Sequence, residues 1–178
     1  MGLSSTWRDV REAPMDKATL IRRIHEERER LLQALEGLSP EEMTDVPVVG
    51  EWTVKDILAH LAVWQGRLIT ALFQLEQGRR PKDLELSPAE VDALNARIYR
   101  EQKDRPLERV LADLHGTFQQ LLRRLERFSD ADLTQPGRFP GLAGPLWELI
   151  ASETYEHDAE HRVDIERWRA ARRGSPGG

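Results

Sequence analysis

The sequence predicts an all-α protein, a four-helix bundle built from two related helix–turn–helix halves. Apolar residues recur at three- and four-residue spacing along four long segments, as they do on the buried face of a helix. Capping sequences and prolines mark the ends of these segments. No segment shows a strand pattern that competes with the helical one.

The composition indicates one globular domain that is rich in helix. The chain has 178 residues, of which 39% are hydrophobic and 32% charged. This length is enough for one substantial core, and we expect a single domain over residues 1–172. Residues 173–178, which end in "GSPGG", are expected to form a disordered tail.

The first two helices have clear boundaries. The first is expected from about Asp16 to Glu36, with its apolar face at Leu20, Ile24, Leu31 and Leu35. The second begins after Thr53, an N-cap with Asp56 three positions later, as in a capping box. Its apolar face runs through Val54, Ile57, Leu61, Trp64, Leu68 and Leu75, and it stops before Gly78.

The third and fourth helices are marked by prolines. The third opens at Ser87-Pro88-Ala89-Glu90, which supplies an N-cap, an N1 proline and an N3 glutamate. Pro106 predicts a break near Asp104, because proline cannot continue a helix without losing a hydrogen bond. The fourth helix is expected to run from Pro145 to about Ala171.

Two segments of the chain resemble one another. "LEGLSPEEMTDVP" begins at Leu35 and "LERFSDADLTQP" begins at Leu125. Each closes a long helix, caps a short one at Ser39 or Ser129, and enters a loop with proline. Two helix ends could share this chemistry by coincidence, but the length of the match favours a duplicated half, and two halves make a four-helix bundle.

Charge and composition exclude several classes of partner. The net charge of −5 predicts that the chain does not bind nucleic acid, since such proteins usually present a basic face. No apolar run is long enough to span a membrane, and no signal peptide opens the chain. The absence of cysteine excludes disulfides and thiolate sites and suits a cytoplasmic protein.

The fourth helix carries a polar interruption in its apolar face. Steps of three and four residues place polar side chains between two apolar ends: Trp147, Ile150, Thr154, His157, His161, Asp164 and Trp168. Buried polar groups cost free energy unless they are satisfied. The four-residue spacing puts the imidazoles of His157 and His161 on one helix face, as when a helix supplies two ligands to a metal ion.

A metal site needs a third ligand, and His60 is the best placed. It lies beside the apolar face of the second helix, which the duplication makes the counterpart of the fourth. His115 could be a boundary histidine, and His25 lies in a charged, solvated stretch. The pair lacks the glutamate of an H-E-x-x-H zinc protease, because Asp158 follows His157. Composition and spacing leave both a metal site and satisfied core histidines open.

"GEWTVKDILAHLAVWQGR" and "YEHDAEHRVDIERW" together resemble the DinB-like superfamily of four-helix proteins, in particular its DfsB/ClbS-like branch. The resemblance covers essentially the whole chain. It implies a divalent ion, zinc or nickel, held by His60, His157 and His161. It also implies a stress or detoxification role, in some relatives with a low-molecular-weight thiol, and a homodimer to which Trp7, Trp147 or Trp168 could contribute.

Two functions therefore compete. The first is a metal-dependent hydrolase or thiol-dependent transferase that acts on a small electrophilic molecule. Glu160, Asp164 and Asp56 are weak candidates for proton transfer, and Trp52, Trp64 and Tyr155 are candidates for lining the substrate pocket. The alternative is a non-catalytic protein that binds or sequesters a small molecule, and a scaffold with hydrogen-bonded histidines is a third reading.

Overall fold

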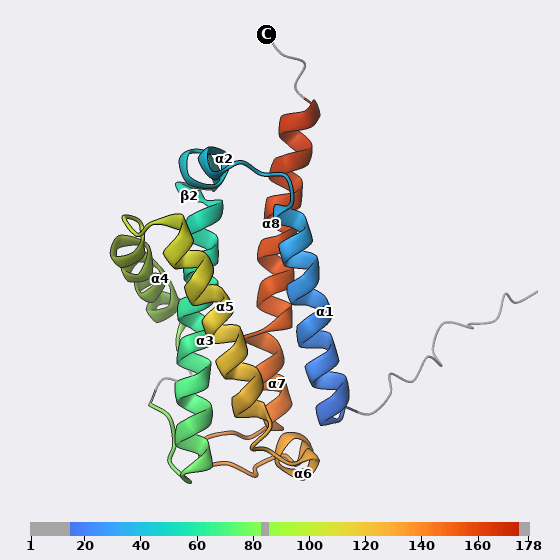
Figure 1. Ribbon diagram of the computed structural model, residues 1–178. Helices are drawn as coiled ribbons and strands as arrows, with labels where there is room; N and C mark the ends of the chain where they lie inside the picture. Colours follow the sequence, from blue (N-terminus) through green and yellow to red (C-terminus); the bar gives the residue numbers. More distant parts are fainter. Residues whose placement is uncertain (1–14, 83–85, 175–178) are drawn as a thin grey trace, which may run out of the picture.

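Four long helices form the body of the protein. In the computed structural model, which describes residues 15–82 and 86–174, these are α1 (Lys17–Leu35), α3 (Val54–Glu76), α5 (Leu107–Leu125) and α8 (Tyr155–Gly174). α3 packs against α5 and α1 against α8, and α3 also contacts α8 (Figure 1). The predicted all-α fold is confirmed. None of the described helices is both long and apolar enough to cross a membrane.

The two resembling segments form equivalent structures. α2 (Pro40–Asp45) follows α1 and α6 (Asp130–Thr134) follows α5, and the two short helices lie at opposite ends of the bundle (Figure 1). The hydroxyls of Ser39 and Ser129 each accept a hydrogen bond from the backbone N–H three residues later. The carboxylates of Glu42 and Asp132 accept one in turn from the backbone N–H of the serine. The helix–turn–helix repeat thus uses the same stop-and-cap chemistry in both halves.

Helix starts agree with the capping sequences. The Asp16 carboxylate accepts a hydrogen bond of 2.7 Å from the Thr19 N–H, and Thr53 and Asp56 form a capping box at the start of α3. The predicted break at Pro106 separates α4 (Pro88–Gln102) from α5. α4 lies outside the four-helix body, against α3 (Figure 1).

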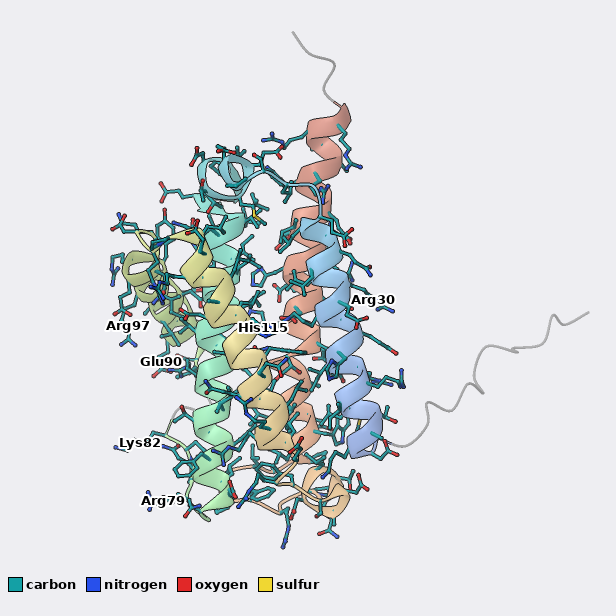
Figure 2. All side chains as sticks on the ribbon, in the orientation of Figure 1. Arg30, Arg79, Lys82, Glu90, Arg97 and His115 are labelled. Atoms are coloured by element: carbon teal, nitrogen blue, oxygen red, sulfur yellow. The ribbon has the colours of Figure 1, made fainter. Side chains whose placement is uncertain are left out.

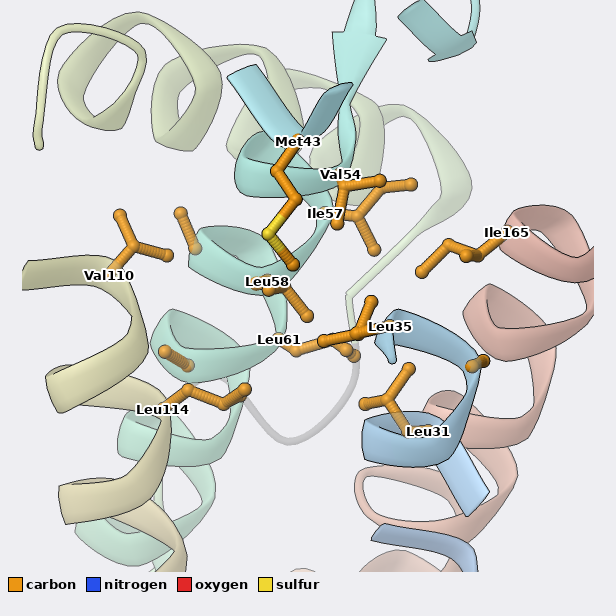
Figure 3. Close-up of a cluster of buried hydrophobic side chains, with 13 residues drawn as sticks. Leu31, Leu35, Met43, Val54, Ile57, Leu58, Leu61, Val110, Leu114 and Ile165 are labelled. Atoms are coloured by element: carbon orange, nitrogen blue, oxygen red, sulfur yellow. The ribbon is translucent and has the colours of Figure 1, made fainter. Parts of the chain in front are cut away.

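The core has two apolar clusters. The one near α2 joins α1, α3, α5 and α8, and Figure 3 shows its side chains, among them Leu31, Ile57, Leu61, Leu114 and Ile165. The other cluster lies toward α6 and contains Leu20, Leu72, Phe118, Leu121 and Ile150. Buried polar side chains, including His60 and Asp158, interrupt the otherwise apolar interior.

Two features differ from the expected all-helical order. β1 (Pro47–Val49) and β2 (Trp52–Thr53) form a small antiparallel hairpin, with Gly50 at φ 57° in the turn. Strands of three and two residues are too short to show the alternation that predicts a strand. The hairpin leads directly into the cap of α3 and positions Trp52 beside that helix.

The fourth long helix is divided. α7 (Leu146–Ser152) ends before Glu153, and α8 begins at Tyr155. The buried Thr154 hydroxyl donates to the Ile150 carbonyl, and the Thr154 carbonyl accepts from the Asp158 N–H. Such side-chain bonds to the backbone compete with regular helical bonds. At the other end, α8 continues through Arg173 and Gly174, so these two residues do not belong to a tail; residues 175–178 lie outside the described part of the chain.

Candidate metal centre

Three imidazoles meet in the interior of the bundle. His60 comes from α3, and His157 and His161 come from α8. The ring centroids are 4.9 Å apart for His60–His157 and 5.0 Å for each of the other two pairs. The Nε2 atoms of His60 and His157 are 2.9 Å apart, and one ring nitrogen from each residue lies within 4.8 Å of the others. The structure therefore brings together the three predicted ligands.

The local sequence explains this convergence. His60 follows Ile57 by three positions and precedes Trp64 by four, so it shares the core-facing side of α3 with both. His157 and His161 are one turn apart on α8. The contact between α3 and α8 closes the site.

Burial keeps the three imidazoles neutral. His60 is only 4% exposed, and its burial, followed by the proximity of His157 and then His161, lowers its pKa to about 2. Burial and the nearby His161 lower the pKa of His157 to about 4. Burial also lowers the pKa of His161, although Glu160, Asp164 and Asp158 act in the opposite direction. At neutral pH all three rings hold free lone pairs, the form that binds metal.

The donor set fits a divalent ion such as zinc. Zinc binds imidazole nitrogens at about 2.0–2.1 Å, so two such ligands in a tetrahedral site lie roughly 3.3 Å apart. The 2.9 Å between the Nε2 atoms of His60 and His157 is close to that separation. Nδ1 of His60 and of His161 are buried without a hydrogen bond to any described residue. The triad could hold a metal ion.

A cavity of about 420 Å³ opens beside the triad. The residues that line it include all three histidines, Trp52 and Trp64. The Trp52 ring lies 5.1 Å from the His60 ring, and the Trp64 ring lies 6.0 Å from it. Asn95 of α4 accepts a hydrogen bond from the Trp64 indole N–H, which fixes the orientation of that ring. Trp52 and Trp64 thus both line this cavity, and their contact with a substrate stays a prediction.

Tyr155 does not lie in this wall. Its ring packs on the apolar cluster toward α6, with the Arg23 guanidinium 6.0 Å from its centroid. Tyr155 precedes His157 by two positions, so it lies on a different face of α8 from the two histidines. Trp147 and Trp168 also pack on core clusters, and Trp7 lies outside the described residues.

The three candidate acids have different environments. Glu160 is exposed and lines the cavity. The Asp164 carboxylate lies 3.6 Å from Nδ1 of His161, too far for a hydrogen bond but suitably placed to orient that ring. The Asp56 carboxylate accepts from the Thr53 N–H and hydroxyl at 3.0 and 2.8 Å, so it caps α3.

Sequence reasoning missed the charged network beside the triad. Asp158 is 3% exposed, and its carboxylate accepts from Nε of Arg28 at 2.7 Å and from Nη2 at 3.3 Å. Burial raises the pKa of Asp158, while Arg28 opposes this shift. Glu27, next to Arg28, pairs with Arg162 at 2.5 Å. The only signal in the sequence was an aspartate at an inward position beside a histidine, and nothing local identified Arg28 as its partner.

The remaining histidines are not near the triad. His25 is exposed on α1 and touches the edge of the Phe118 ring at a centroid distance of 5.4 Å. His115 is exposed on α5 rather than at a core boundary (Figure 2).

The bundle and the triad define a class: helical proteins that hold three histidines from two core helices in a buried candidate metal site. Residues 23–163 match the DinB superfamily, and the chain belongs to that family. The predicted family is thereby confirmed. No protein of curated function matches the chain in sequence.

Several solved structures share the fold. An uncharacterised protein of Escherichia coli UTI89 superposes with a TM-score of 0.77 at 17% identity, covering 92% of this chain and 98% of that one. The colibactin self-resistance protein ClbS, in complex with double-stranded DNA, gives 0.75 at 21% identity over 88% and 97%. DfsB, described as a sibling lethal factor precursor, gives 0.74 at 18% over 92% and 100%.

The ClbS complex corrects one expectation. The exclusion of nucleic acid as a partner is wrong, because a protein of this fold is seen bound to double-stranded DNA. The net charge of −5 was an insufficient basis for that exclusion. Phosphates are contacted by local groups of Lys and Arg, so a chain with an acidic total can still present a basic face.

Proposed function

We propose that this protein is a metal-dependent enzyme that acts on a small electrophilic molecule, as a hydrolase or a thiol-dependent transferase of stress or detoxification type. The observation that carries the proposal is the set of three neutral imidazoles, His60 buried and His157 and His161 partly buried, with nitrogens within 4.8 Å of one another beside a cavity of about 420 Å³. A buried cluster of perturbed histidines next to a cavity is typical of a functional site rather than of packing.

The chain supplies most of what such a reaction needs. His60, His157 and His161 would hold the divalent ion, which would supply Lewis acidity and lower the pKa of a water or thiol. Burial by α3 and α8 keeps the rings unprotonated and limits water at the site. Trp52 and Trp64 offer flat apolar surfaces to a substrate. Glu153 and Glu160 both line the cavity, and Glu160 is the exposed one, which can exchange protons with solvent.

The absence of cysteine agrees with either reaction. A transferase built on this chain would take its sulfur from a low-molecular-weight thiol that enters the cavity, since no residue of the chain carries a thiol. A hydrolase would use water at the same position. Self-association and a cytoplasmic location stay predictions, and the proposed chemistry does not depend on them.

Metal content is the first test. Protein purified without a histidine tag should contain close to one zinc, nickel or similar ion per chain when measured by elemental analysis. A preparation that lacks metal and fails to take up added zinc or nickel would contradict the proposal, because the neutral triad would then serve only packing.

Turnover is the second test. The metal-loaded protein is incubated with an aryl epoxide, with and without added cysteine, and products are measured by mass spectrometry. Water opening the ring gives a diol, and the thiol gives a hydroxy thioether. Either product should form faster than with the His60→Ala variant. Binding of the epoxide without product would instead indicate a non-catalytic binding protein.

A further inference from the structure

A second and larger cavity adjoins the triad. Its volume is about 550 Å³, within the usual range for small-molecule sites. It lies along α3, beside the end of α7 and the turn after α3. Trp64 and Glu153 line both this cavity and the one that contains the histidines. The two spaces are therefore neighbours that share a wall.

One face of α3 provides an apolar wall. Val63, Leu68 and Ala71 line the cavity together with Leu149 of α7. Gly66, in the middle of α3, keeps this wall open: a Cβ added there would meet nothing within 4 Å. Glycine in a helix interior costs about 0.5–1 kcal/mol relative to alanine. The space in front of Gly66 is therefore open to a bound molecule.

The cavity also has a basic lining. Arg67, Arg79, Arg80 and Lys82 line the cavity, and Glu153 is the one acid among its described lining residues. Figure 2 shows the Arg79 and Lys82 side chains at the end of α3. Among the described residues, Arg79, Arg80 and Lys82 have no ion-pair partner. An excess of cations in a cavity of a chain with net charge −5 creates a local field that attracts anions.

Two of these cations are held in place by packing. The Arg67 guanidinium lies 5.3 Å from the centre of the Trp64 ring, in a cation–π arrangement. The Arg80 side chain crosses Gly141 so closely that a Cβ at that position would lie 2.7 Å from Arg80 Cγ. Fixed arginines lose less side-chain entropy when they bind a ligand.

We propose that this cavity binds the anionic end of a small organic acid, a carboxylate, phosphate or sulfonate attached to an apolar body. The anion pairs with Arg79 and Arg80, the apolar body lies on the α3 wall, and the molecule extends past Trp64 toward the histidines. The last part rests on the proposed function, since it makes this molecule the substrate of the triad. The anion site itself does not require metal.

Binding of 1-anilinonaphthalene-8-sulfonate, followed by fluorescence, tests the proposal. The Arg79→Gln/Arg80→Gln double variant should bind the probe about tenfold more weakly, the effect expected from loss of charged hydrogen bonds. The matched control is Arg97→Gln/Arg100→Gln on the exposed side of α4, which removes the same charge and should bind normally. Equal binding by both double variants would overturn the proposal.

Gly66→Leu provides an independent steric test. The side chain enters open space and leucine favours a helix, so the variant should fold at least as stably as the parent, which thermal unfolding checks. It should lose probe binding by filling the cavity. A stable Gly66→Leu protein that still binds the probe normally would place the probe elsewhere and overturn the proposal.

Competition identifies the ligand class. 4-Phenylbutyrate should displace the probe, and the uncharged 4-phenylbutyramide should do so at least tenfold less well. Displacement by short double-stranded DNA but not by 4-phenylbutyrate would assign the basic lining to a nucleic-acid backbone and overturn the proposal. His60→Ala should keep probe binding while it loses metal. The anion site and the metal site can therefore fail separately.

Discussion

His60 combines unusual burial with unmet hydrogen bonding. It is 4% exposed, and its Nδ1 has no partner among the described residues. Burying a polar group without compensation typically costs about 1–3 kcal/mol. If the residue at this position served only to pack the bundle, an apolar side chain would avoid that cost. The nitrogen of His60 that is placed to bind a metal is the other one, Nε2, which lies 2.9 Å from Nε2 of His157.

Single substitutions of the triad test this role. Zinc binding should weaken by more than about 100-fold in each of His60→Ala, His157→Ala and His161→Ala. Losing a residue that only hydrogen-bonds to a metal ligand already weakens binding by up to about 100-fold, and losing the ligand itself should cost more. Competitive chelator titration measures this change. His25→Ala and His115→Ala remove exposed imidazoles and should leave zinc affinity unchanged. Full affinity in His60→Ala would mean that the α8 pair has a different third partner.

The buried pair of Arg28 and Asp158 should determine how α1 and α8 pack. Asp158→Ala leaves the Arg28 guanidinium buried without its carboxylate, which typically costs about 3–5 kcal/mol of unfolding free energy. Arg28→Met combined with Asp158→Leu removes both charges and should cost much less. Urea unfolding measures both variants. A double variant as unstable as Asp158→Ala would show that lost packing, rather than an unpaired charge, dominates.

At the scale of elements, the points where α3 and α8 begin determine the positions of the three histidines. The hairpin and the Thr53 cap set where α3 begins, and His60 lies two turns into that helix. The division between α7 and α8 sets the start of the helix that carries His157 and His161. Local bonds at these two points therefore decide the register of the triad.

Replacing Asp56 distinguishes a structural role at the start of α3 from a catalytic role. Asp56→Ala should lower the free energy of unfolding by about 1.5–3 kcal/mol, the usual value of hydrogen bonds to a charged group, because its carboxylate accepts from Thr53. Asp132→Ala, at the equivalent capping box of α6, should also lower it, with the ion pair to Arg138 lost in addition. Once folded, the metal-loaded Asp56→Ala protein should keep its turnover. A variant of near-normal stability but no activity would instead make Asp56 part of the chemistry.

For the whole molecule, the triad should make stability depend on pH. In the unfolded chain the histidines titrate near pH 6.5, whereas in the metal-free folded protein the pKa of His60 is about 2 and that of His157 about 4. As pH falls below 6.5 the unfolded state binds more protons, so stability is present above 6.5 and is lost below it. Each such histidine contributes a slope of about 1.4 kcal/mol per pH unit.

Chemical denaturation between pH 7.5 and 5 with a chelator present measures this slope. His60→Ala should show a shallower loss of stability at acid pH than the parent, and His25→Ala should follow the parent. Identical slopes for the parent and His60→Ala would show that burial does not hold His60 neutral.

Much of the fold could be predicted because its determinants are local. The capping residues at Ser39, Thr53, Ser87 and Ser129 act within three positions of themselves, and the apolar spacing reflects one turn of one helix. The four-residue interval of His157 and His161 is likewise a property of a single helix. His60 could be added because the repeated halves made α3 and the fourth helix counterparts.

The tertiary structure alone decided the rest, because those features depend on residues far apart in the chain. Arg28 and Asp158 are 130 positions apart, and no periodicity connects them. The packing of Tyr155 on the cluster toward α6 depends on residues of other helices. The basic cavity gathers side chains from α3, α7 and the turn after α3. The net charge of a sequence does not show where its charged residues lie in the fold. The electrostatic field at a site depends on which charges the fold brings together there.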